Sequence, residues 1–145
     1  MEKACKKLSK DFDCEVVYDE STRGEVGSPH IDRIVENKIG DCDVFVADVT
    51  PVTNNQGKLM PNSNVMYELG RAYGKHNYQR IIVLAAEGDW NVKNMPFDIN
   101  HSTIIPVDVN NSDYFYHLIK GSVKYSIDSL DTIFSYNDFV LYSDL

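Results

Sequence analysis

The chain has 145 residues, of which 43% are hydrophobic and 25% are charged, and its formal net charge is -8. This length fits one domain whose apolar core is large enough to fold without a disulfide or a metal. The acidic balance argues against nucleic acid as a partner, because phosphate binding needs a basic face. The sequence has no apolar run of membrane-spanning length and no metal-like spacing of histidines or cysteines, and its three cysteines favour free thiols in a reducing cytoplasm.

The first third of the chain predicts two helices with a strand between them. Residues 2–12 have apolar positions at helical spacing, and residues 14–18 form a short apolar run typical of a strand. Ser28 and Pro29 then fit the N-cap and the first position of a helix that Gly40 ends.

The middle and the end of the chain continue this alternation. Residues 44–47 are continuously apolar, which is typical of a strand covered on both faces in a parallel sheet. The polar residues 50–63 predict a long loop, and a helix is expected over about 64–74. The later segments predict a strand at 80–86, a loop at 89–102, a strand at 103–107 and a closing helix through Phe115, Ile119, Val123 and Ile127.

This alternation predicts an α/β fold, a doubly wound parallel sheet with helices on both faces. Such sheets normally start with a central strand, whereas this chain starts on a helix, so we expect the usual first strand to be missing. We expect one domain over residues 1–130, followed by a C-terminal aromatic tail over 131–145 that the pattern does not place.

Four polar residues are predicted to meet where strands end. Asp48 and Thr50 follow the buried strand at 44–47, and ligands of open α/β sheets bind outside the carboxyl ends of the strands. Asn64 and Glu68 are four residues apart and share one face of the next helix. Trp90, in the loop after the following strand, is a candidate for stacking on a base.

Each of these residues also has a purely structural interpretation. Asp48 fits a cap of the loop that follows its strand, and Asn64 fits the N-cap of its helix. Glu68 is also consistent with a surface glutamate whose charge interacts favourably with the dipole of its helix. Trp90 is also consistent with an aromatic side chain packed at the margin of the core.

Four motifs occur in order along the chain and together carry a family resemblance. They are Gly-Ser-Pro-His-Ile at 27–31, Val-Phe-Val-Ala-Asp-Val at 44–49, Asn-Ser-Asn-Val-Met-Tyr-Glu-Leu-Gly at 62–70 and Pro-Phe-Asp at 96–98. Over roughly residues 14–107 the chain resembles the TIR-like and nucleoside 2-deoxyribosyltransferase-like superfamily, most of all the bacterial TIR-like nucleotide-binding proteins.

The resemblance implies a flavodoxin-like fold and an activity on N-glycosidic bonds. It identifies Glu68 with the catalytic carboxylate and NAD⁺ with the substrate, without a further cofactor. It implies antiviral defence as the setting. The positions of Asp48, Thr50, Asn64 and Trp90 make these four residues our candidates for substrate binding. Because a site without the usual first strand encloses a ligand poorly and the aromatic tail offers apolar surface, we expect the chain to work as a homo-oligomer or as a module of a larger protein. A nucleoside 2-deoxyribosyltransferase and a non-catalytic nucleotide sensor or assembly module remain alternatives.

Overall fold

The computed structural model describes residues 2–12, 15–19, 31–128 and 138–142. Its elements are α1 Glu2–Phe12, β1 Glu15–Asp19, α2 Ile31–Asp41, β2 Phe45–Asp48, β3 Thr53–Asn55, β4 Lys58–Met60, α3 Ser63–Lys75, η1 Tyr78–Arg80, β5 Ile81–Ala86, η2 Val92–Asn94, α4 Phe97–Asn100, β6 Ile104–Val107, α5 Ser112–Asp128 and β7 Asp138–Tyr142. The predicted helix start at Ser28 and Pro29 lies outside the described residues. The described helices include none that is long and apolar enough to cross a membrane.

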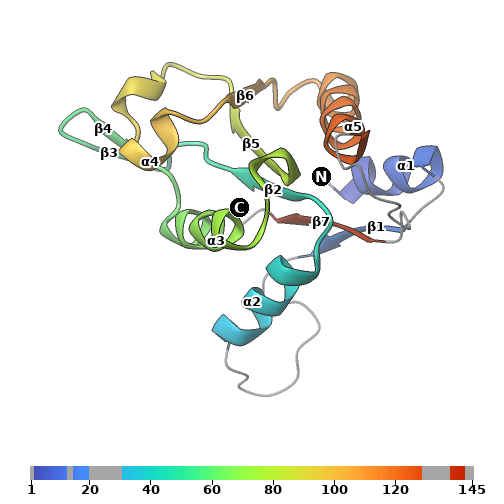
Figure 1. Ribbon diagram of the computed structural model, residues 1–145. Helices are drawn as coiled ribbons and strands as arrows, with labels where there is room; N and C mark the ends of the chain where they lie inside the picture. The colour runs from blue at the N-terminus through green and yellow to red at the C-terminus, as the bar shows by residue number, and fades with distance from the viewer. Residues whose placement is uncertain (1, 13–14, 20–30, 129–137, 143–145) are drawn as a thin grey trace.

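Five strands form one parallel sheet in the order β1-β7-β2-β5-β6 (Figure 1). Strand β7 pairs on one side with β1, where Val140 is opposite Val17, and on the other side with β2, where Val140 is opposite Phe45. Strand β7, the last of the described strands, therefore occupies an inner position of the sheet. The prediction of an open parallel α/β sheet is confirmed.

Alternate residues of the inner strands face two separate layers of helices, and each layer has its own apolar cluster. Val44, directly before β2, and Val46 of β2 belong to the cluster covered by α1 and α5, whereas Phe45 and Ala47 of β2 belong to the cluster covered by α2 and α3. Figure 1 shows α1 beside α5 and α2 beside α3. Because helices cover both faces of these strands, side chains on either face are buried, and the sequences of the strands are therefore uninterrupted apolar runs.

Helix α1 is fastened to α5 by a polar cluster around Asp11. The hydroxyl of Tyr116 and the ammonium of Lys120 both donate to its Oδ2 atom, and Lys7 Nζ lies 4.0 Å from the centre of the Tyr116 ring. The hydrogen bonds from Lys120 and Tyr116 hold the pKa of the Asp11 carboxyl below its usual 3.8. Leu8, on the same helix, is buried against the α5 side of the sheet.

The stretch 50–63 is not the uninterrupted loop that its polarity predicted, because it contains a two-stranded antiparallel hairpin. Strands β3 and β4 pair with Asn55 opposite Lys58, so Gln56 and Gly57 form a two-residue turn. Both residues have positive φ, 52° and 84°, as a turn that matches the strand twist requires. Asn54 Oδ1 accepts a hydrogen bond from Gly57 N at 3.0 Å and closes the turn.

Candidate functional site

A chain of hydrogen bonds joins the carboxyl ends of the neighbouring strands β2 and β5. Thr50 donates to Asp48 Oδ1 from its backbone nitrogen, at 2.9 Å, and from its hydroxyl, at 2.5 Å. The same hydroxyl accepts from the backbone nitrogen of Ala86 at 2.8 Å. Trp90 Nε1 in turn donates to the carbonyl of Ala86 at 2.7 Å. We call Asp48, Thr50, Ala86 and Trp90 the strand-end network.

The local sequence explains why the chain turns away from the sheet at this point. Val49 N still donates to Leu84 O at 2.8 Å, so the pairing of β2 with β5 extends one residue past Asp48. Pro51 then follows, and its missing N–H and fixed φ end the strand. The turn leaves Thr50 with a hydroxyl that can donate to one strand end and accept from the other.

Asp48 has the most capacity for a ligand within this network. Its side chain is partly exposed, and both of its hydrogen bonds are to Oδ1. Oδ2 accepts no hydrogen bond from any residue in the described ranges. An ionised carboxylate is an acceptor on both oxygens, so Asp48 can receive the hydroxyl of a bound sugar through Oδ2.

The indole of Trp90 is held in place from two sides. Its Nε1–H is committed to the Ala86 carbonyl, and the partly buried ring packs against the apolar cluster on the α2 and α3 side of the sheet. A Cβ atom added at Gly88 would lie 3.2 Å from Cδ1 of the indole, so a side chain at position 88 would push against the ring. Trp90 thus belongs both to the core margin and to the strand-end network.

Helix α3 begins directly after the hairpin, and its N-cap is Asn62. Asn62 Oδ1 accepts from the backbone nitrogen of Asn64 at 2.8 Å, which satisfies one of the free donors of the first turn. The interpretation of Asn64 as the N-cap is therefore wrong by two residues. Asn64 lies in the first turn with an exposed side chain.

Glu68 is buried on the side of α3 that faces the sheet. It is 5% exposed and shares this side with the buried residues Val65, Leu69 and Ala72. The hydrogen bonds of the strand-end network do not include Glu68. Glu68 lies about 7.5 Å along the helix axis from Ser63, the first residue of α3.

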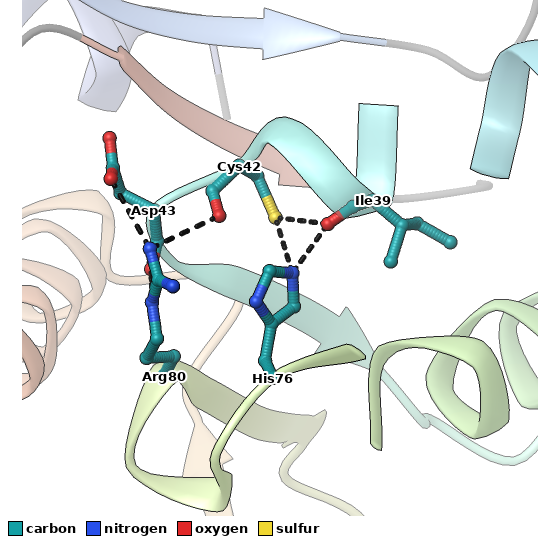
Figure 2. A network of polar contacts seen from close by, with 5 residues as sticks. All are labelled: Ile39, Cys42, Asp43, His76 and Arg80. Carbon is teal, nitrogen blue, oxygen red and sulfur yellow. Dashed lines mark hydrogen bonds and ion pairs between the residues drawn. The ribbon is translucent and has the colours of Figure 1, made fainter. Parts of the chain in front are cut away.

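A second polar network, which the sequence analysis did not identify, lies at the opposite, amino end of β2 (Figure 2). His76 Nε2 lies 3.6 Å from Cys42 Sγ and contacts the carbonyl of Ile39. Arg80 Nε donates to the carbonyl of Asp43 at 2.7 Å, and its Nη2 lies 3.3 Å from Asp43 Oδ1. No sequence spacing reveals these contacts, because they join residues that are more than 30 positions apart.

The cysteine and the histidine of this network do not form a nucleophilic pair. Cys42 is 1% exposed, and burial raises the pKa of its thiol from 9.0 to about 12. The thiolate, which is the nucleophile, is therefore absent at neutral pH. The network instead clamps the end of α2, through Ile39 and Cys42, to the end of α3, where His76 is the C-cap.

The described residues contain no group of three His, Cys, Asp or Glu side chains that could hold a metal ion. Comparisons with protein-family models, with curated proteins and with solved structures find no match for this chain.

Proposed function

We propose that this chain is a TIR-like enzyme that cleaves the N-glycosidic bond of NAD⁺ and releases nicotinamide, with Glu68 as the catalytic carboxylate. The main support is the strand-end network, which holds Asp48, Thr50 and Trp90 at the carboxyl edge of a parallel sheet. Nucleotides bind at this edge in open α/β sheets. In this proposal Asp48 Oδ2 accepts a ribose hydroxyl, and Asn64 and Trp90 contact the rest of the nucleotide.

A single carboxylate is sufficient for this reaction. Ordinary glycosides need a second, protonated carboxyl group to assist the departing oxygen. In NAD⁺ the nicotinamide nitrogen is already cationic, so nicotinamide leaves as a neutral molecule without a general acid. Glu68 then stabilises the positive charge that develops on the ribose until water adds to the ribosyl carbon, and its buried position strengthens this interaction because the local dielectric is low.

The same burial favours the non-catalytic nucleotide sensor as the second candidate. A side chain that is 5% exposed contacts a substrate only after the neighbouring segments move. Catalysis by Glu68 therefore requires such a movement. A sensor needs only the exposed part of the site, which includes Asp48.

Incubation of the protein with NAD⁺, with nicotinamide measured by chromatography, tests the proposal. We expect release of nicotinamide by the wild-type protein and a loss of at least about a hundredfold in rate for Glu68→Gln, because the amide keeps the shape but not the charge. Binding of NAD⁺, measured by calorimetry, is expected to change little in Glu68→Gln and to weaken about tenfold in Asp48→Asn.

Glu36→Gln is a matched control for charge. Glu36, on α2, pairs with Arg71 at 2.5 Å and with Lys75 at 3.7 Å on the surface of the helix layer, so its loss is expected to leave turnover unchanged. Near-normal nicotinamide release by Glu68→Gln would remove Glu68 from the mechanism. Binding of NAD⁺ without turnover in the wild-type protein would support the sensor, and base exchange on a deoxynucleoside would support the transferase.

A further inference from the structure

A pocket of about 920 Å³ opens at the amino end of the sheet, at the opposite end of β5 from the strand-end network. Its lining includes Ile81, Ile82 and Val83, the first residues of β5. The register pairs Val83 with Ile104, the first residue of β6, so β5 starts two residues earlier than its neighbour. Within the described residues, Ile81 and Ile82 therefore have no strand beside them on the β6 side, which leaves room for the pocket.

Three tyrosines from three different elements line this pocket. They are Tyr73 of α3, Tyr78 of η1 and Tyr125 of α5, and they are 39%, 76% and 71% exposed. Tyr73 Oη lies 3.0 Å from Ser102 Oγ, which ties α3 to the segment that precedes β6. Aromatic side chains gathered on one exposed concave surface are typical of recognition sites, because they offer a large contact area and lose little conformational entropy on binding.

The charge of the lining selects against anions. Asp98 supplies the carboxylate of the lining and His101 its imidazole, and the lining contains no lysine or arginine. Asp98 forms no ion pair with another residue in the described part of the chain. The faces of the tyrosine rings carry negative electrostatic potential and attract cations. A nucleotide phosphate is thus disfavoured here, and the pocket is distinct from the site at the carboxyl edge.

We propose that this pocket binds a small aromatic amine, that is, a planar aromatic ring that carries a cationic ammonium group. The ring packs on the isoleucines of β5 and on the tyrosines, and the ammonium pairs with Asp98. The pocket volume lies within the range of about 300–1,000 Å³ that is usual for small-molecule sites. This proposal does not depend on the proposed NAD⁺ chemistry.

Three probes that share the indole ring and differ in charge test the proposal. Tryptamine is a cation, tryptophol is neutral and indole-3-acetate is an anion, and their affinities for the full chain can be measured by NMR titration at low ionic strength. We expect tryptamine to bind about fivefold more tightly than tryptophol, from an exposed ion pair and a cation–π contact, and indole-3-acetate to bind most weakly. Equal affinities for the three probes, or tightest binding of indole-3-acetate, would overturn the proposal.

Two substitutions link this selectivity to the pocket. Asp98→Asn is expected to remove the advantage of tryptamine over tryptophol. Gly121→Phe is expected to abolish binding of all three probes, because Gly121 lines the pocket and a Cβ atom there meets no other atom within 4 Å. Gly121→Ala is the matched control, since it adds one methyl group to the same helix position and leaves the pocket open. Unchanged tryptamine binding in Gly121→Phe, with the fold intact by NMR, would show that the amine binds elsewhere.

Discussion

Burial determines the chemistry of Cys42. Its thiol lies near an imidazole, as the thiol of a nucleophilic cysteine does, yet desolvation raises its pKa to about 12. The opposing influence of the Arg80 charge, which lowers the pKa, is the smaller of the two. Proximity of a cysteine to a histidine is therefore insufficient as a sign of catalysis, and the exposure of the sulfur has to be considered with it.

The elevated pKa predicts that Cys42 resists alkylation in the folded protein. At pH 9 a thiol with a pKa of 9.0 is half ionised, whereas one with a pKa of about 12 is about 0.1% ionised, and burial limits access further. Treatment with iodoacetamide at pH 9, followed by peptide mass spectrometry, is expected to leave Cys42 unmodified in native conditions and to modify it in guanidinium chloride. Rapid native labelling of the Cys42 peptide would show that the thiolate is accessible.

The raised pKa also has a consequence for stability. A thiol whose pKa is higher in the folded state stabilises the fold fully below its unfolded pKa of 9.0 and loses this contribution as the pH rises toward about 12. In Cys42→Ala this contribution is missing. We expect the unfolding free energy of the wild-type protein to fall relative to that of this variant between pH 9 and pH 12. The difference, measured by denaturant titration, should be constant below pH 8.

At the scale of single residues, the sequence correctly predicted the end of strand β2 but not the residues that are linked to Asp48 and Thr50 there. The position of Asp48 and Thr50 after an apolar run was sufficient to place them at the carboxyl edge of the sheet. Their link to Trp90 passes through the backbone of Ala86, and a backbone group leaves no trace in the residue pattern. The contact of His76 with the end of α2 depends on how two helices pack, which is equally invisible in the sequence.

At the scale of elements, amphipathic helices and apolar strands were predictable, whereas the hairpin β3–β4 was not. Its described strand residues are exposed apart from the partly buried Leu59, so they show no alternation of apolar and polar side chains. The turn residues were the available signal, since Asn55-Gln56-Gly57 combines residue types that tolerate positive φ at its ends. Within residues 50–63, Gly57 supplies the positive φ that the turn between β3 and β4 needs.

Gly57→Ala is accordingly expected to loosen the hairpin. Gly57 has a φ of 84°, which costs an alanine about 1 kcal/mol, and the substitution is free of steric contacts because a Cβ atom there meets nothing within 4 Å. Amide exchange measured by NMR should become faster at the paired residues of the hairpin and remain unchanged in β2 and β5. Protection of the hairpin amides equal to that in the wild-type protein would contradict the positive-φ requirement.

Gly74→Ala provides a control of opposite sign. Gly74 lies within α3, where a Cβ atom also meets no atom within 4 Å, and alanine is favoured over glycine in a helix by up to about 1 kcal/mol. We expect this variant to unfold at a higher denaturant concentration than the wild-type protein. The two glycines thus separate the effect of positive φ from the effect of helix propensity.

At the scale of the whole molecule, the strand order is the feature that local pattern reasoning could not reach. The alternation of elements predicted a parallel sheet with helices on both faces, and the two apolar clusters confirm this arrangement. The position of β7 between β1 and β2 depends on pairing between segments more than 90 residues apart. Pairing of this kind depends on tertiary packing and not on the residue pattern of the strand alone.

The free edge of the sheet at β6 is protected against pairing with further chains. Pro106 lies within this edge strand, opposite Ala85, and has no N–H to offer to a neighbouring strand. If copies of the chain associate, they are therefore expected to do so through other surfaces than the outer edge of β6.

The inner position of β7 leads to a prediction about the C-terminal residues. In the described structure β1 pairs with β7 and with no other strand, and β7 also borders β2. A chain truncated after residue 128 loses β7, which leaves β1 without a partner and exposes one edge of β2. Because both strands then have unpaired backbone groups at an apolar edge, we expect this chain to lose its cooperative thermal transition and to aggregate, as measured by circular dichroism and light scattering.

A chain truncated after Tyr142 keeps β7 and is expected to melt as the full chain does. Val140→Pro adds a test by point substitution, since a proline in an inner strand removes a ladder hydrogen bond and clashes with the pairing on both sides. Cooperative melting of the chain truncated after residue 128, at a temperature close to that of the full chain, would show that β7 is not needed for the fold.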